Sequence, residues 1–123
     1  MSSWTPKQLD SVRNHDDFTI APDRDHQGAP GRLIWVWAVE VDGDIFVRSA
    51  NPTSRWFASA ATFQRGSAFI ADQTEPVSIA VVDDDELRDQ VDEAFRRKYA
   101  HDPYFSEDVL TGSRQQIARL RPA

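Results

Sequence analysis

The sequence contains no cysteine, which excludes disulfide bonds and thiolate metal sites. No apolar run approaches the ~20 residues that a membrane-spanning helix needs. The first six residues also lack the basic and apolar segments of a secretory signal. We therefore expect a cytoplasmic domain that does not interact with a membrane.

Basic residues and glycine are scarce. Acids outnumber bases 20 to 14, so the chain repels the phosphate backbone of nucleic acids and no nucleic-acid partner is expected. There are five glycines but no Gly-x-Gly-x-x-Gly or Walker motif, which argues against a Rossmann or P-loop nucleotide site. The three histidines lack metal-ligand spacing and no serine lies in a Gly-x-Ser-x-Gly motif. The sequence therefore predicts no metal site and leaves any catalytic residues unknown.

The strongest structural pattern lies at 33–49. Two β-rich runs flank Asp42-Gly43, which is a hairpin signal because such tight turns need positive φ. Both faces of the first run carry apolar side chains, so both faces should be buried. A barrel interior on one side and a helix or a second subunit on the other would provide that cover.

Helices and further strands surround this hairpin. Thr5 and Pro6 are typical of a helix start and predict a short helix over 4–14. A small helix is expected at about 55–63, and an apolar residue at every fourth position from Leu87 to Tyr99 predicts a long helix over 83–100. The remaining expected elements are a short strand at 18–20, a second hairpin of 67–71 and 76–82 around 72–74, a loop at 101–113 and a closing strand over 114–120.

These elements predict a single α+β domain over 1–123, with a small antiparallel β-barrel of about six strands. An N-terminal helix, a short helix and one long helix pack on the barrel. The chain is long enough to form one hydrophobic core without disulfide bonds.

The segment 48–56 offers the clearest binding chemistry. Arg48 and Arg55 present fork-shaped donors that suit a phosphate. Hydroxyl groups come from Ser49, Thr53 and Ser54, the start of a helix adds free backbone N–H groups, and Trp56 could face a planar ring. An ordinary capped turn with solvent-facing arginines explains the same pattern, so both interpretations stay open.

Short motifs along nearly the whole chain resemble a family of small bacterial proteins of unknown function. They are Trp4-Thr5 before Leu9-Asp10, Ile20-Ala21-Pro22, Ile34-Trp35-Val36, Val47-Arg48-Ser49, Trp56-Phe57, Lys98-Tyr99 and Arg114 to Pro122. That family is similar in turn to the split β-barrel flavin-binding proteins, the pyridoxamine-phosphate-oxidase-like group with its deazaflavin-dependent nitroreductase branch.

This resemblance implies a split barrel that forms a homodimer and binds FMN or a deazaflavin at the subunit interface. The candidate cofactor-binding residues that it suggests are Arg48, Ser49, Arg55 and Trp56, together with Tyr104 and Arg114. Trp35 is a further candidate, as an indole that could contact the ring. The chain departs from the better-known flavin members because it is shorter and has no lysine-containing phosphate motif. Its two lysines, Lys7 and Lys98, both fall in predicted helices.

Three functional hypotheses follow. The first is a flavin- or deazaflavin-dependent oxidoreductase that acts on a small molecule, with the cofactor carrying the hydride. The second is a dimeric barrel that binds a small ligand without a cofactor. The third is a cofactor-free enzyme that uses a pocket carboxylate such as Asp16 or Asp17, and it requires that carboxylate to be buried with a raised pKa.

Overall fold

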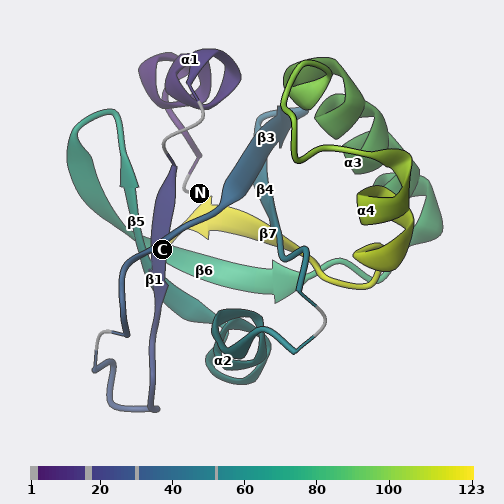
Figure 1. Cartoon of the computed structure of the whole chain (residues 1–123). Coiled ribbons are helices and arrows are strands. Elements are labelled where there is room, and N and C mark those ends of the chain that lie inside the picture. The colour runs from purple at the N-terminus through teal and green to yellow at the C-terminus, as the bar shows by residue number, and fades with distance from the viewer. Residues whose placement is uncertain (1–2, 16–17, 30, 52) are drawn as a thin grey trace.

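The computed structural model describes residues 3–15, 18–29, 31–51 and 53–123. Within them the chain forms four helices and seven strands, shown in Figure 1. In chain order the elements are α1 Pro6–Asn14, β1 Thr19–Pro22, β2 Ile34–Trp35, β3 Trp37–Val41, β4 Asp44–Arg48, α2 Arg55–Phe63, β5 Arg65–Ile70, β6 Gln73–Val81, α3 Asp85–Tyr99, α4 Glu107–Gly112 and β7 Ile117–Pro122.

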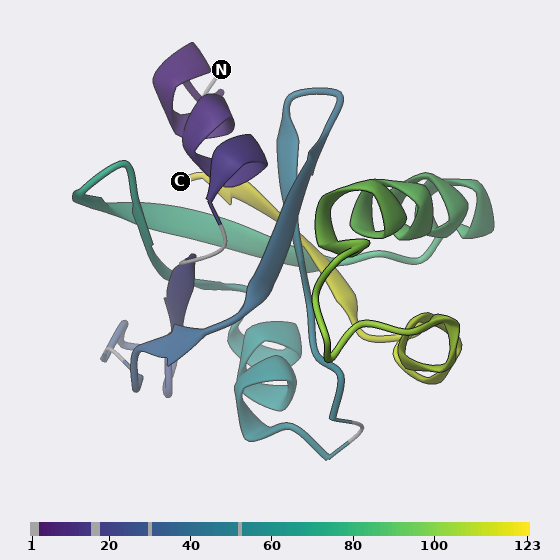
Figure 2. The same ribbon diagram turned by 45° about the horizontal axis from the view of Figure 1, so that its top comes forward.

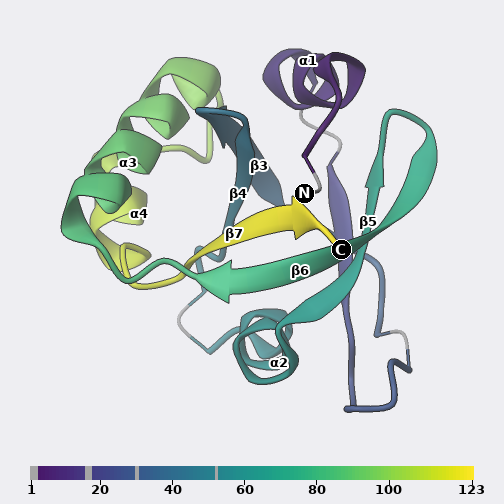
Figure 3. The same ribbon diagram turned by 180° about the vertical axis from the view of Figure 1, so that it is seen from behind.

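One segment forms both edges of the sheet. The strand order is β2-β1-β5-β6-β7-β4-β3, and every neighbouring pair is antiparallel. Only Val36 separates β2 from β3, and its amide donates to the carbonyl of Phe18 at 3.0 Å. The sheet must therefore curl back on itself (Figures 1 and 3). This confirms the predicted α+β split barrel, with the expected strand at 33–41 broken at Val36.

The two hairpin turns differ in how well sequence identified them. Asp42 and Gly43 form the predicted turn, with φ of 52° and 86°. In the second hairpin Ile70 pairs with Gln73, so the turn is Ala71 and Asp72, with φ of 50° and 64°. Its expected position at 72–74 was wrong, because alanine is not a residue that normally marks a turn with positive φ.

The helices largely follow their predicted positions. Thr5 caps α1 in a complete capping box, Ser54 caps α2, and Asp84 caps α3 one residue later than expected. The helix α4 was missed, since six residues are too few to show a helical period. Its cap, Ser106, and the two acids that follow are the only local signals. The loop expected over 101–113 therefore contains a helix, and the last strand begins at Ile117 instead of 114.

Two hydrophobic cores lie on opposite faces of the barrel wall. The interior core includes Ile20, Val47 and Leu120 and is closed at its two ends by α1 and α2 (Figures 1 and 2). The second core joins the outer face of β3 and β4 to α3, with Phe46 and Phe95 fully buried. The predicted burial of both faces is therefore confirmed for β3, but it was wrong for the start of the same run, where Leu33 and Trp35 are exposed. Among the described residues no helix is both long and apolar enough to cross a lipid bilayer.

The turn at Ala71 and Asp72 generates a stability prediction. Alanine at φ 50° is strained by its Cβ, whereas asparagine tolerates the left-handed region. Ala71→Asn should raise the free energy of unfolding by about 1 kcal/mol. Urea titration measures the change, with Ala80→Asn, in the exposed and regular part of β6, as the control that should not gain stability. An Ala71→Asn variant no more stable than the parent would contradict strain at this turn.

Candidate functional site

A mostly apolar pocket lies where β4 leaves the sheet and the chain turns into α2. Its volume is about 300 Å³, at the lower end of the range for small-molecule sites. The lining residues are Trp35, Val36, Trp37, Arg48, Ser49, Ala50, Asn51, Ser54 and Trp56. Four of the seven candidates from sequence, Trp35, Arg48, Ser49 and Trp56, therefore contribute to one pocket.

Three indoles line this pocket. Trp35 is 50% exposed, whereas Trp56 is partly buried and packs on the interior core. Trp37 is buried and stacks on Tyr99 of α3, with ring centroids 5.4 Å apart and an interplanar angle of 29°. Sequence analysis treated Trp37 as a strand residue without a site role. Its position two residues after Trp35, on the same face of the predicted strand, was the signal that it lies beside the same pocket.

The polar groups of the turn mainly hold the turn itself. The Ser49 hydroxyl donates to the Asn51 carbonyl at 3.0 Å, and the Gln116 side-chain amide donates to the same oxygen at 3.0 Å. The Ser54 hydroxyl accepts from the Phe57 amide at 3.3 Å as the cap of α2. The pocket wall is therefore a braced turn, and its hydroxyls already have partners.

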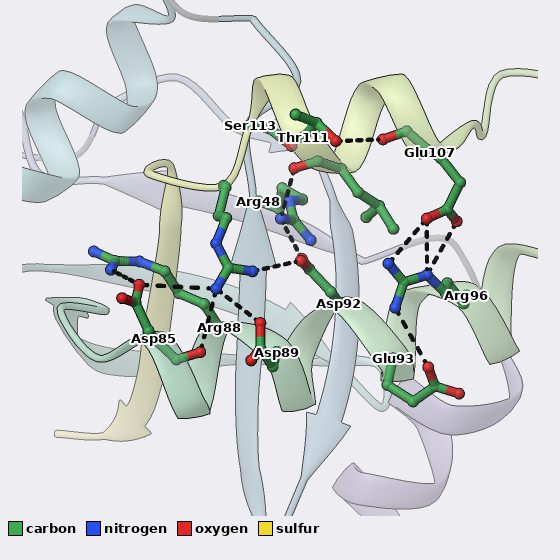
Figure 4. A network of polar contacts seen from close by, with 12 residues as sticks. Arg48, Asp85, Arg88, Asp89, Asp92, Glu93, Arg96, Glu107, Thr111 and Ser113 are labelled. Atoms are coloured by element: carbon green, nitrogen blue, oxygen red, sulfur yellow. Dashed lines mark hydrogen bonds and ion pairs between the residues drawn. The ribbon is translucent and has the colours of Figure 1, made fainter.

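Arg48 directs its side chain toward α3. The side chain has no accessible surface, and Nη2 donates to Asp92 Oδ1 at 2.5 Å and to the Leu110 carbonyl at 3.3 Å (Figure 4). The guanidinium lies over the Phe95 ring, 5.1 Å from its centroid. Burial lowers the pKa of Arg48, and this outweighs the opposing effect of Asp92. Its Nε and Nη1 have no hydrogen-bond partner among the described residues, so a phosphate could reach this guanidinium only after rearrangement.

Arg114 belongs to the same polar network. Its Nη1 donates to Asp92 Oδ2 at 2.9 Å, and its Nη2 lies 2.7 Å from Asp89 Oδ1. Asp92 therefore bridges two arginines, one on each carboxylate oxygen. The hydrogen bond to Asp89 is the main cause that raises the pKa of Arg114. We call Arg48, Asp92 and Arg114 the Asp92 bridge.

The two remaining candidates lie outside the pocket lining. Arg55 is exposed in the first turn of α2, directly before Trp56, and makes no hydrogen bond or ion pair with the described residues. Tyr104 is 80% exposed, in the segment between α3 and α4. Asp16 and Asp17, the carboxylates considered for a cofactor-free enzyme, lie outside the described residues.

Two of the three histidines lie in a different place. His15 and His101 line a second cleft of about 480 Å³ between the C-terminal ends of α1 and α3. The described residues contain no group of three or more histidine and acidic side chains able to hold a metal ion. Separation by 86 positions hid this proximity of the two histidines from sequence reasoning.

The fold and its tryptophan-lined pocket define the class as a small split-barrel domain. The chain belongs to the family described as "Uncharacterized protein conserved in bacteria (DUF2255)", whose pattern matches residues 8–120. A similar fold occurs in the conserved hypothetical protein Rv2991 of Mycobacterium tuberculosis, with a TM-score of 0.64 and 18% sequence identity. That match covers 97% of this chain and 80% of the other. A search of curated proteins finds no match.

The bridge predicts unequal effects for two aspartates that bind the same arginine. Asp92→Ala leaves Arg48 buried without a carboxylate partner among the described residues, which should destabilise the protein by about 3–5 kcal/mol. Asp89→Ala removes an exposed partner of Arg114 and should change stability by about 1 kcal/mol or less. Thermal and urea unfolding of the two variants measure this difference. Equal losses of stability in the two variants would show that the burial of Arg48 does not increase the contribution of Asp92.

Proposed function

We propose that this protein binds a planar aromatic cofactor of the flavin type, FMN or a deazaflavin, and acts as an oxidoreductase on a small molecule. The observation that carries the proposal is the convergence of Trp35, Trp37 and Trp56 on one apolar pocket. Large indole surfaces are well suited to contact a planar conjugated ring. The motif resemblance to split-barrel flavin proteins supports the same class of ligand.

The ring system and the phosphate of such a ligand would contact different parts of the site. The indoles and the apolar lining suit the ring system, and Trp35 provides an accessible face at the pocket mouth. For the phosphate, the first turn of α2 offers Arg55 and backbone N–H groups that have no acceptor within the helix. Arg48 does not suit this role in the observed arrangement, because Asp92 holds its buried side chain. We therefore assign the phosphate to Arg55 and retain Ser49 and Trp56 as pocket contacts.

The cofactor supplies the hydride chemistry when it is bound. The work of the chain is then to orient the ring against its indoles, to exclude water with the apolar lining, and to hold the anionic tail at α2. This division of labour requires no acid–base residue in the pocket, and we assign none.

A second candidate function is cofactor-free binding of an apolar small molecule. It is favoured by the sequestration of Arg48, the one cation among the described lining residues, whose buried side chain is held by Asp92. A neutral ligand would use the indoles without needing either arginine. The two candidates differ in whether an anionic group on the ligand improves affinity.

We also propose that two copies of the chain associate through the uncovered outer face beside β2. Trp35, Thr19 and Phe69 lie opposite one another across β2, β1 and β5. Trp35 and Phe69 are 50% and 42% exposed, and Leu33 is 59% exposed nearby in the chain. Large apolar side chains concentrated on a sheet face favour a protein interface.

Ligand titration tests the cofactor proposal. FMN, riboflavin and a deazaflavin should each quench tryptophan fluorescence, and Trp35→Leu should weaken that response to all three. Arg55→Ala should weaken FMN binding about threefold, as expected for an exposed charge contact, and leave riboflavin unchanged. Lys7→Ala is the matched control, because it removes an exposed positive charge on α1, at the opposite end of the barrel (Figure 1).

No binding of any of the three up to about 1 mM, a very weak affinity, would rule out the flavin-type site. If a neutral apolar dye such as Nile red binds instead and Trp35→Leu removes that binding, the cofactor-free alternative holds. Equal loss of FMN affinity in Arg55→Ala and Lys7→Ala would contradict a phosphate contact at α2.

Light scattering tests the proposed association. The protein should have the mass of a dimer, and Phe69→Ser should shift it toward the monomer because the substitution removes exposed apolar area. Val81→Ser, at an exposed apolar position on β6, is the control that should leave the mass unchanged. A monomer at all concentrations would contradict this interface.

A further inference from the structure

The Asp92 bridge is an energetically costly contact between β4 and α3. The Arg48 side chain is wholly buried, and two of its three nitrogens have no hydrogen-bond partner among the described residues. Burial lowers its pKa despite the adjacent carboxylate, so desolvation outweighs the attraction of Asp92. Buried ion pairs of this kind often stabilise no better than apolar side chains of similar size. Stability alone therefore does not explain the bridge.

The bridge fixes the position of α3 along its axis, which apolar packing leaves undetermined. The face of α3 toward the sheet repeats an apolar side chain at every fourth position, Leu87, Val91, Phe95 and Tyr99. Such a stripe can pack against β3 and β4 in more than one position along its axis, because apolar contacts are not directional. Asp92 has one position in which it reaches both arginines. Setting a register of this kind is the best-attested role of polar groups that are buried among apolar ones.

The register of α3 bears directly on the pocket. Tyr99, about two helical turns beyond Asp92, stacks on Trp37. Its hydroxyl accepts from the Ala38 amide at 3.1 Å and lies 3.2 Å from the Ala38 carbonyl. Trp37 lines the pocket beside Arg48 and Ser49. Arg48 also precedes the braced turn, where the Ser49 amide donates to the Gln116 carbonyl at 3.1 Å. A shift of α3 would therefore change two parts of the pocket wall.

We propose that Asp92 is a positioning residue for the tryptophan pocket, acting through Arg48 and Arg114 to set the register of α3 and with it the orientation of Trp37. Asp92 does not touch the pocket itself, so it acts only through these neighbours. The binding part of this inference rests on the proposed function, whereas the orientation of Trp37 can be measured without any ligand.

A double variant separates positioning from stability. Arg48→Met with Asp92→Leu replaces the buried ion pair by apolar side chains of similar size, so its melting temperature should equal or exceed that of the parent. Its FMN affinity should nevertheless fall about tenfold, in the range of coupling through packed neighbours. The indole N–H resonance of Trp37, assigned with Trp37→Phe, should also shift or broaden.

Two further proteins serve as controls. Arg121→Met with Asp44→Leu replaces another arginine–aspartate pair, which joins β4 to β7 at 3.0 Å. Asp44 lies at the opposite end of β4 from Arg48, and neither residue lines the pocket. This variant should leave both the affinity and the Trp37 resonance unchanged. Asp92→Asn keeps an oxygen and a nitrogen in place of the carboxylate, and it should retain the Trp37 resonance more closely than the apolar pair does.

The inference is overturned if the Arg48→Met and Asp92→Leu protein keeps the parental Trp37 resonance. It is equally overturned if that protein does not fold, because the bridge would then be needed for stability itself. If the parent binds no flavin, the proposed function fails, while the Trp37 resonance still decides whether Asp92 positions the pocket wall.

Discussion

The closure of the sheet by a single segment is the constraint on which the rest of the structure depends. The chain from Ile34 to Val41 pairs with β1 at one edge of the sheet and with β4 at the other. Edge strands expose unpaired backbone groups. Because one segment serves both edges, the sheet closes on that segment instead of ending in two unconnected edge strands. This closure also fixes the curvature that creates an interior for one core and an outer face for the other.

The break in this segment places the candidate site. At Val36 the backbone stops pairing in the pattern of β2 and begins that of β3, and the flanking indoles of Trp35 and Trp37 both line the pocket. One is half exposed and can meet a ligand, whereas the other is buried and transmits contacts from α3. The accessible face and the supporting layer of the pocket therefore come from two consecutive strands of one segment. The Asp92 bridge orients the supporting layer.

Sequence was most informative where a local rule decides the structure. Asp42-Gly43 marked a turn that needs positive φ, and the capping box at Thr5 marked the start of α1. It was least informative where distant residues compete. Arg48 resembled a solvent-facing phosphate ligand, yet Asp92, 44 positions away, holds it in the outer core. A pattern within 48–56 contains no information on that partner. The sequence signal for the burial of Arg48 was its position two residues after Phe46, on the same buried outer face of β4.

The resonances of the four indole N–H groups test the central claim most directly. Trp4 is an internal reference, because it is buried and its Nε1 donates to the Leu120 carbonyl at 3.0 Å, outside the pocket lining. On addition of FMN, the account predicts saturable shifts for Trp35, Trp37 and Trp56 and none for Trp4. Resonances that do not move, or a Trp4 shift as large as the others, would contradict binding in the tryptophan pocket.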